Sequence, residues 1–452
     1  MGERKLFGTD GIRGVAGLPP LDPQMVTLIG RAAARTLGRQ HERPQVAVGR
    51  DTRHSGDLIE AALVAGLTSE GADVMILGIV PTPGVSFLTR SLNLDAGVVI
   101  SASHNPYPDN GIKLFGADGA KLGDALEEEI EREALAPGPP RTGTALGRTA
   151  NFRESTLMYQ RWFASLEGAD LHGLKIAVDC ANGATYHVAP EVLKSLGARV
   201  EAFHAAPDGQ NINDGCGSTD PGSLQREVVK GGFDLGVAFD GDGDRVVFVD
   251  REGRLATGDH ILAVCAAHLQ AENRLGGNAV VGTTMSNLAL ERALAARGLE
   301  LVRAPVGDRY VYERCLELGA VLGGEQSGHV LFLDLAPTGD GILTAVQTLA
   351  GLRATGLTLG ELIASMPLFP QVLQNVAVED RALATHDAVL AAVAAAEQEL
   401  AGRGRINVRA SGTERLIRVM VEADDEAVAR DLAGRVAGVI AGVAASAPTA
   451  HS

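Results

Sequence analysis

One serine of the chain lies where a nucleophile would need to be. Ser103 follows the apolar run Ala96–Ile100, with His104 and Asn105 beside it and Pro106 closing the loop. A hydroxyl at the end of a buried strand, in a loop that a proline stiffens, can be presented to a cleft with little freedom. The flanking glycines of a G-x-S-x-G elbow are absent. A polar turn capped by serine and asparagine is the alternative, and this segment by itself favours it.

Three aspartates stand at alternate positions in a second loop. Asp240, Asp242 and Asp244 are separated by glycines and lie between two apolar runs, residues 235–239 and 246–250, that are typical of strands. Carboxylates this close repel one another unless a cation lies among them, and Mg²⁺ prefers oxygen ligands. An EF-hand does not fit, because arginines stand at its glycine and bidentate-acid positions. A solvated acidic turn is the alternative, and the mutual repulsion favours a metal site.

A third loop combines hydroxyls, a glycine and arginines. It runs from Arg409 through Ser411, Gly412 and Thr413, and Arg418 follows in the next apolar run. Hydroxyl groups, backbone N–H groups exposed at a glycine and guanidinium groups can form a cradle for an anion. It is not a Walker loop, which requires G-x-x-x-x-G-K-[ST]. An ordinary turn is the alternative.

Together the three loops supply the parts that phosphoryl transfer needs. The hydroxyl would be the nucleophile, a divalent cation would neutralise charge, and the cradle would orient a phosphate. The chain has 40 Lys and Arg against 56 Asp and Glu, a net charge of −16. This charge opposes nucleic acid or an anionic membrane as the main partner. We therefore expect an enzyme whose anion-binding sites are local.

Three stretches of the chain share a strand–loop–helix pattern that could position these loops. Each begins with a short β-branched run, continues through a polar loop and ends in an Ala- and Leu-rich stretch, as βαβ units do. Their recurrence at intervals of roughly a hundred residues predicts three similarly built domains in series. The strands are expected at residues 46–48, 176–178 and 279–281, and the helices at 57–67, 190–196 and 288–296.

The rest of the chain follows another pattern. Residues 136–144 are rich in proline and predict a linker, and Pro367 and Pro370 mark a second break. Beyond this break we expect an α+β unit with strands at 372–378, 405–408 and 416–421 and helices at 387–400 and 426–443. By size alone, 452 residues would form about three domains. The pattern predicts four, at residues 1–150, 151–254, 255–368 and 369–452.

The cysteines and the apolar segments indicate the compartment. The spacing of the cysteines is not the paired spacing that a structural zinc or a dithiol site needs, so we expect buried thiols in a reducing environment; they are Cys180, Cys216, Cys265 and Cys315. Residues 1–7 are charged and lack the apolar stretch of a signal peptide. Every apolar run is shorter than the about 18 residues of a membrane-spanning helix. A cytoplasmic enzyme is therefore expected.

Four motifs, in this order along the chain, resemble those of the α-D-phosphohexomutase superfamily. They are residues 101–106, 240–245, 324–329 (Gly-Glu-Gln-Ser-Gly-His) and 409–418. Gln326 and the runs 284–287 and 306–311 are more similar to those of the phosphoglucosamine mutases than to those of other members. The resemblance implies three related α/β domains with mixed sheets and a smaller C-terminal α+β domain, arranged around a central cleft.

The resemblance also implies roles for single residues. Ser103 would carry the phosphoryl group as a phosphoserine, and its phosphate would hold one Mg²⁺ ion together with Asp240, Asp242 and Asp244. The acid–base candidates are Arg13, His104 and Lys113. Arg245 would contact the transferring phosphate, and the remaining substrate contacts would come from Glu325, Ser327 and His329 at the sugar hydroxyls and from Arg409, Ser411, Gly412, Thr413 and Arg418 at the other phosphate.

The activity that the resemblance implies is the interconversion of glucosamine 6-phosphate and glucosamine 1-phosphate, for UDP-N-acetylglucosamine synthesis. Phospho-Ser103 would give its phosphoryl group to the sugar, and the bisphosphate intermediate would turn end for end and return the other phosphate. A hexose or hexosamine 1,6-bisphosphate is the expected activator. The expected partner is a small sugar phosphate, with no nucleic acid and no membrane. The oligomeric state stays open, with a homodimer as one arrangement.

Two other activities compete with this interpretation. A phosphomannomutase or phosphoglucomutase of the same superfamily would use the same motifs, because none of the runs explains recognition of a 2-amino group. A magnesium-dependent sugar phosphatase would use Asp240 as nucleophile and Asp242 as acid, but it leaves Ser103 and the Arg409 loop unexplained. The chain departs from the family pattern at Arg415, where a proline that would stiffen the loop is usual.

Overall fold

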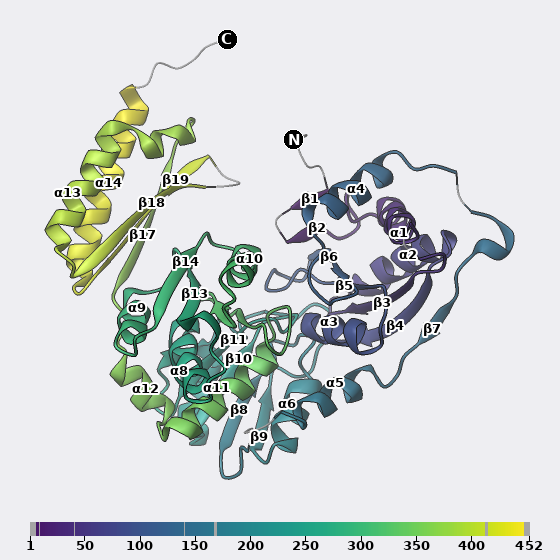
Figure 1. Cartoon of the computed structure of the whole chain (residues 1–452), viewed down its shortest axis with the longest axis horizontal. Helices are drawn as coiled ribbons and strands as arrows, with labels where there is room; N and C mark the ends of the chain where they lie inside the picture. Colours follow the sequence, from purple (N-terminus) through teal and green to yellow (C-terminus); the bar gives the residue numbers. More distant parts are fainter. Residues whose placement is uncertain are drawn as a thin grey trace.

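The computed structural model describes residues 6–8, 10–39, 41–139, 141–166, 170–411 and 415–446. The strands in these ranges form four sheets, which follow one another along an arc (Figure 1). Three sheets mix parallel and antiparallel pairs and the last is antiparallel, which confirms the predicted fold class. In the part of the chain that is described, no helix combines the length and the apolar character needed to cross a bilayer.

The first sheet has the order β1-β2-β6-β5-β3-β4-β7. β3 pairs in parallel with β4 and β5, and β6 pairs antiparallel with β5 and β2. The strands are β1 (Phe7–Gly8), β2 (Gly11–Val15), β3 (Gln45–Arg50), β4 (Asp73–Ile79), β5 (Ala96–Ile100), β6 (Asp109–Gly116) and β7 (Thr149–Asn151). The helices are α1 (Pro23–Leu37), α2 (Gly56–Ser69), α3 (Thr82–Ser91), α4 (Asp124–Leu135) and the 3₁₀ turn η1 (Gly143–Ala145).

The proline-rich segment before β7 is fastened to the first domain. Arg31 donates a 2.8 Å hydrogen bond to the carbonyl of Gly138, and Arg35 bonds to that of Pro139. Both arginines also pair with the buried Glu70. Beyond this segment, β7 returns to pair with β4. The predicted linker therefore follows the surface of the first domain instead of spanning a gap.

The second and third sheets are built around parallel pairs. Their orders are β12-β11-β10-β8-β9 and β14-β13-β15-β16. The second domain contains β8 (Lys175–Asp179), β9 (Arg199–Phe203), β10 (Leu235–Phe239), β11 (Val246–Asp250), β12 (Leu255–Ala256), α5 (Ser155–Phe163), α6 (Val188–Ser195) and α7 (Gly222–Gly231). The third contains β13 (Ala279–Thr283), β14 (Glu300–Ala304), β15 (Leu322–Gly324), β16 (Val330–Phe332), α8 (Gly258–Ala271), α9 (Leu288–Ala295), α10 (Asp308–Leu318), α11 (Gly341–Thr355), α12 (Leu359–Ser365) and the 3₁₀ turn η2 (Gly276–Asn278).

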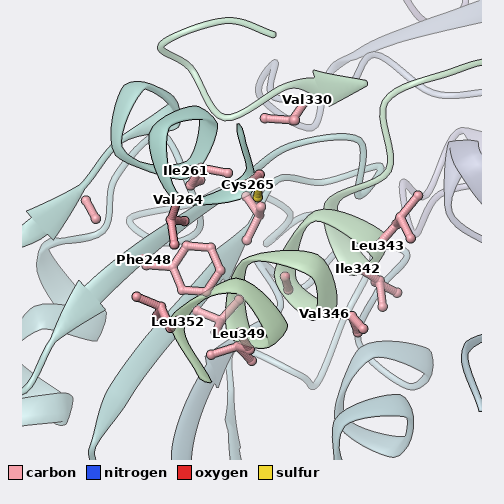
Figure 2. Close-up of a cluster of buried hydrophobic side chains, with 14 of the residues drawn as sticks. Phe248, Ile261, Val264, Cys265, Val330, Ile342, Leu343, Val346, Leu349 and Leu352 are labelled. Carbon is pink, nitrogen blue, oxygen red and sulfur yellow. The ribbon is translucent and has the colours of Figure 1, made fainter. Parts of the chain in front are cut away.

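These two domains share one hydrophobic core. Phe248 of β11 packs among Ile261 and Val264 of α8 and Leu349 and Leu352 of α11 (Figure 2). The first and fourth domains have clusters of their own. A continuous apolar interior resists separation because pulling it apart exposes nonpolar surface to water. The second and third domains are therefore expected to move as one body.

The fourth domain is a small α+β unit. Its antiparallel sheet has the order β17-β19-β18, and two helices cover one face of it (Figure 1). Its elements are β17 (Gln371–Ala377), the 3₁₀ helix η3 (Arg381–Thr385), α13 (Asp387–Leu400), β18 (Gly404–Ala410), β19 (Leu416–Ala423) and α14 (Glu426–Ser446). The strands and helices expected in this region are all present.

Candidate active site

Ser103 leaves the end of β5, as the sequence predicted. β5 is buried along its whole length, and Ser103 follows in a left-handed backbone conformation with φ of +52°. Its hydroxyl donates a 2.7 Å hydrogen bond to the Asp240 carboxylate and lies 3.3 Å from His104 Nδ1. A side-chain-bearing residue in this conformation costs free energy, and such residues cluster at functional sites. The loop thus holds a buried hydroxyl against the acidic loop of the second domain.

The shape of this loop depends on Arg53, which the sequence analysis did not single out. Arg53 is 1% exposed, and its guanidinium donates to the carbonyls of Ser103 and Asn105 at 2.9 and 2.8 Å. Two further carbonyls of the loop also accept from it, and its Nε pairs with Asp51 at 2.9 Å. The planar fork of five donors suits arginine to such a role. Arg53 therefore fixes the backbone that carries Ser103.

The order of the strands in the first sheet would have pointed to Arg53. Asp51 and Arg53 follow β3, and β3 is the parallel neighbour of β5. The carboxyl ends of parallel strands meet at one edge of a sheet, where sites form in α/β folds. The sequence predicted the strand at 46–48, but it did not reveal which strand lies next to it.

A second support comes from the second domain. The Asn213 amide donates to the carbonyls of Ser103 and Asn105 at 2.9 and 3.2 Å. Thr52 in turn donates a 2.6 Å hydrogen bond to the Asn182 carbonyl. The Ser103 loop is therefore held from both sides of the junction between the first two domains.

The three predicted acidic residues converge in the turn between β10 and β11. Asp240, Asp242 and Asp244 are at most 5% exposed, and each offers a carboxylate oxygen within 4.8 Å of the others. Burial, and then the charges of Asp244 and Asp242, raise the pKa of Asp240 well above its ordinary value. A cation placed among the three groups would remove this penalty.

Unpaired oxygens support a metal site in this turn. The Oδ1 atoms of Asp242 and Asp244 are buried and have no hydrogen-bond partner among the described residues. The second oxygen of Asp242 accepts from Thr82 at 2.7 Å, which orients the carboxylate. Buried carboxylate oxygens without donors suit a hard cation. The donor set therefore fits Mg²⁺.

Lys113 and Arg13, both predicted, lie beside the acidic turn. Lys113 Nζ is 3.1 Å from Asp10, 3.3 Å from Asp242 and 3.8 Å from Asp244. Burial alone would lower the pKa of Lys113, but these three carboxylates outweigh it, so the pKa lies above its ordinary value. Lys113, an acid–base candidate, is therefore protonated and places a positive charge beside the acidic turn. Arg13 pairs with Asp10 as well; Asp10 was not among the residues predicted from the sequence.

His104 differs from Lys113 in its protonation. Burial lowers the pKa of His104 to about 4, and the charges of Arg245 and Arg13 act in the same direction. The imidazole is then neutral near neutral pH, with a lone pair that can accept a proton. Among the acid–base candidates, Lys113 is thus protonated and His104 neutral.

The predicted sugar-binding loop lies against the acidic turn. Arg245 and His329 form an antiparallel bridge, and Glu325 accepts a 3.0 Å hydrogen bond from the backbone N–H of Gly307. His329 is buried, with a ring nitrogen that has no hydrogen-bond partner among the described residues. Ser327 is exposed. These polar groups are available to a hydroxylated ligand.

An ion pair links this loop to the first domain. Lys121 bonds to Asp308 and also to Asp10. Asp308 begins α10 and lies close to the sugar-binding loop. Its carboxylate is 4.0 Å from His329 Nδ1. A cavity of about 140 Å³ at this junction is lined by residues that include Lys121, Asp308, Arg309 and His329. The run 306–311 therefore lies beside the predicted sugar loop.

The predicted phosphate cradle belongs to the fourth domain. Arg409 of β18 and Arg418 of β19 are direct partners in the antiparallel ladder, and burial followed by the charge of Arg418 lowers the pKa of Arg409. Like charges opposite each other destabilise a sheet unless an anion compensates. Ser411 is buried at 3% exposure. Gly412 and Thr413 lie outside the described residues.

Two features noted in the sequence, Arg415 and the run 284–287, make contacts within the protein. Arg415, at the usual proline position, is exposed and pairs with Glu379 at 2.6 Å. The run 284–287 holds the fourth domain: Arg405 donates to the carbonyls of Thr284 and Ser286 at 2.9 and 2.6 Å. This run therefore joins two domains.

Comparison with known proteins agrees with this architecture. Four descriptions from the phosphoglucomutase/phosphomannomutase family match the chain in order: α/β/α domains I, II and III at residues 4–138, 159–253 and 257–369, and the C-terminal domain at 373–439. The phosphoglucosamine mutase of Deinococcus deserti is 54% identical over 443 residues, which are 97% of this chain and 99% of that protein.

Solved structures give the same result. A phosphoglucomutase/phosphomannomutase family protein from Burkholderia thailandensis superposes with a TM-score of 0.80 at 25% identity, over 100% of this chain and 99% of that one. The Aspergillus fumigatus N-acetylphosphoglucosamine mutase, in complex with GlcNAc-6P and magnesium, has a TM-score of 0.68 at 19% identity, over 98% and 96% of the two chains. The chain therefore belongs to the phosphoglucomutase/phosphomannomutase family, among the phosphoglucosamine mutases.

Proposed function

We propose that this chain interconverts glucosamine 6-phosphate and glucosamine 1-phosphate, with Ser103 as the residue that carries the transferring phosphoryl group. The observation that supports Ser103 most directly is its buried 2.7 Å hydrogen bond to Asp240, within the acidic turn. A phosphate on that oxygen would adjoin the three carboxylates, a contact that only a cation would make favourable. Membership of the phosphoglucosamine mutases supports the choice of substrate.

The cation we propose is Mg²⁺, held by Asp240, Asp242 and Asp244. The unpaired oxygens of the turn support this choice, and magnesium is present in the Aspergillus complex. A bound Mg²⁺ would neutralise charge on the phosphoryl group during transfer. A hexose or hexosamine 1,6-bisphosphate would load Ser103 with phosphate.

The two half-reactions exchange a phosphoryl group between Ser103 and the sugar. In the first, the bond between phosphorus and Ser103 Oγ breaks while a bond forms to the sugar hydroxyl, whose proton passes to a base. Neutral His104, whose Nδ1 lies 3.3 Å from Ser103 Oγ, can accept that proton and pass it to the leaving serine oxygen, and the positive charge of Lys113 would stabilise that oxygen. In the second, the reoriented bisphosphate returns its other phosphate to Ser103. The phosphoryl group that Ser103 loses in the first step is therefore replaced in the second.

Substrate orientation is assigned to the second, third and fourth domains. Arg245 would contact the transferring phosphate, and Glu325, Ser327 and His329 would bind the hydroxyls. The other phosphate would be held in the fourth domain by Arg409, Ser411, Gly412, Thr413 and Arg418. A fixed donor and a fixed cradle can serve both half-reactions only if the substrate turns between them. Movement of the fourth domain would give it room.

Other features of the protein stay predictions. We propose domain boundaries near residues 150, 254 and 368; the first sheet extends to Asn151 and the second to Ala256, so the sheets change close to these positions. A cytoplasmic location and a homodimer are kept as expectations, and the proposed partner is a sugar phosphate.

A competition assay tests the choice of substrate. The 6-phosphates of glucosamine, glucose and mannose are supplied together with Mg²⁺ and a trace of glucose 1,6-bisphosphate. We expect the highest kcat/KM for glucosamine 6-phosphate. A higher value for glucose or mannose would make the chain a phosphoglucomutase or phosphomannomutase. Release of inorganic phosphate without isomerised product would identify a phosphatase.

A further inference from the structure

The second domain contains a cluster of three potential metal ligands that the proposed reaction does not use. A carboxylate oxygen of Asp179, a ring nitrogen of His204 and the sulfur of Cys216 all lie within 4.8 Å of one another. The residues come from separate segments: Asp179 ends β8, His204 follows β9, and Cys216 lies in the loop before α7. The cluster is separate from the aspartates at 240–244.

Two of the three side chains are removed from water. Asp179 and Cys216 are 0% exposed, and the side chain of His204 is 29% exposed. The cluster therefore places a carboxylate in the interior with one imidazole near it. A buried carboxylate is costly unless a positive charge or several donors compensate it.

Backbone groups fix the direction of the carboxylate. One oxygen of Asp179 accepts from the N–H of Ala181 at 2.9 Å, and the other accepts from that of Gly217 at 3.0 Å. Since a carboxylate has about four acceptor sites, Oδ1 retains a lone pair, whereas Oδ2 also faces His204 at 3.1 Å. Ligating carboxylates in metal sites are held in this way.

The imidazole is also held with one nitrogen facing inward. His204 Nδ1 lies 3.1 Å from Asp179 Oδ2, and Nε2 lies 3.4 Å from the Ser223 hydroxyl on the other side of the ring. This contact with Asp179 raises the pKa of His204, but it is poorly aligned as a hydrogen bond, and Nδ1 has no other partner among the described residues. A metal-ligating histidine has its second ring nitrogen occupied by a polar partner. His204 also adopts a strained φ of +46°.

We propose that Asp179, His204 and Cys216 form a binding site for a borderline-soft divalent cation, best matched by Zn²⁺. Zn²⁺ accepts oxygen, nitrogen and sulfur ligands, and three protein ligands leave a fourth position for water. Mg²⁺ would be rejected because it demands oxygen ligands. A carboxylate, a thiolate and a neutral imidazole carry two negative charges, which a divalent cation cancels.

The thiol becomes a ligand only when it loses its proton. Burial, and then the charge of Asp179, raise the pKa of Cys216 to about 12 in the metal-free protein. A coordinated thiol is deprotonated outright, so binding releases its proton to solvent. The cysteine spacing in the sequence excluded only sites made of cysteine pairs, and this site contains one cysteine.

Such an ion would join three segments beneath the active site. The loop from His204 to Cys216 carries Asn213, whose amide holds the carbonyls of Ser103 and Asn105. Cross-linking both ends of this loop would restrict its motion. The cation would therefore brace a loop that positions Ser103, without touching the substrate.

Cobalt spectroscopy tests the site in the full-length enzyme. Co²⁺ is titrated into the protein in the presence of excess Mg²⁺, and thiolate-to-cobalt charge-transfer absorption is recorded in the near ultraviolet. The aspartates at 240–244 offer only oxygen, so they contribute no such band. We expect one equivalent of Co²⁺ to produce the band and Zn²⁺ to abolish it by displacement.

Matched variants assign the band. Cys216→Ser should lose it, and His204→Asn should weaken Co²⁺ binding by at least about tenfold, since asparagine tolerates the left-handed backbone. Cys265→Ala and His172→Asn should keep it; His172 belongs to an exposed His–Asp pair. Absence of the band in the unmodified enzyme, or its persistence in Cys216→Ser, overturns the proposal. The first measurement needs no variant, so a folding defect cannot obscure the result.

Discussion

Ser103 of the first domain and Asp240 of the second are joined by a 2.7 Å hydrogen bond. Both side chains are buried, and the loops that carry them meet without intervening space. A Cβ atom built on Gly241 would lie 2.7 Å from the Ser103 carbonyl oxygen. The serine loop and the acidic turn are therefore set against each other before any substrate binds.

Gly241→Ala should separate these loops. The added methyl group cannot fit beside the Ser103 carbonyl, and a displacement of reacting groups by about 1 Å can cost a hundredfold in rate. We expect kcat to fall by about that factor while the protein remains folded. Gly434→Ala is the matched control, because its Cβ would meet open space. Equal activity of the two variants would contradict this close contact.

Arg53→Met should destabilise the first domain. The substitution removes the donors that hold the Ser103 loop and leaves Asp51 buried without its partner. Breaking a buried pair in this way costs about 3–5 kcal/mol. Urea unfolding should show the loss, and mutase activity should fall with it. Arg43→Met removes an exposed arginine paired with Asp73 and should change neither.

The junction of the third and fourth domains should depend on Arg405 and Glu422. Glu422 is 0% exposed and pairs with Arg405, whose guanidinium also donates to Thr284 and Ser286. Arg405→Met removes the ion-pair partner of that carboxylate, which keeps hydrogen bonds from Gln371 and Leu288, and should destabilise the fourth domain by about 3 kcal/mol. Adding Glu422→Gln should restore part of the loss. Calorimetry of both variants measures the effect; additive losses would contradict the pairing.

The pH dependence of stability should contain a contribution from Asp259. Burial raises the pKa of Asp259 to about 7, above its ordinary value of 3.8 in an unfolded chain. The folded state then binds more protons than the unfolded state between about pH 4 and pH 7, so stability falls as pH rises through this window. The slope is at most about 1.4 kcal/mol per pH unit.

Asp259→Asn should remove that contribution. Urea unfolding across the same window should give a shallower decline for the variant than for the unmodified protein, and the variant should be the more stable one above about pH 7. Asp220→Asn changes an exposed aspartate and should leave the slope intact. An unchanged slope in Asp259→Asn would show that Asp259 ionises normally.

Local pattern was enough to predict the strands, the loops that follow them and the acidic turn. Two patterns can be recognised within a few residues of sequence: the apolar run before Ser103 and the alternation of aspartate with glycine at 240–244. The predicted strand at 46–48 and the helix at 57–67 fall within β3 and α2 for the same reason.

Relationships between distant segments could not be predicted in this way. Arg53 and Asn213 support Ser103 only because their loops fold back on it, across about 50 and 110 residues of chain. The core shared by the second and third domains likewise depends on how Phe248 of β11 meets α8 and α11. Each of these pairings is decided by packing, which periodicity does not encode.

The proposed reaction depends on transfer of the phosphoryl group through Ser103. The enzyme is first loaded with labelled phosphate from glucose 1,6-bisphosphate, and phosphopeptide mass spectrometry locates the label. Unlabelled glucosamine 6-phosphate is then added for a single turnover. We predict that the label begins on Ser103 and moves to the sugar, and that Ser103→Ala is neither labelled nor active. Full activity of Ser103→Ala, or a label that stays on the protein during turnover, would contradict the account.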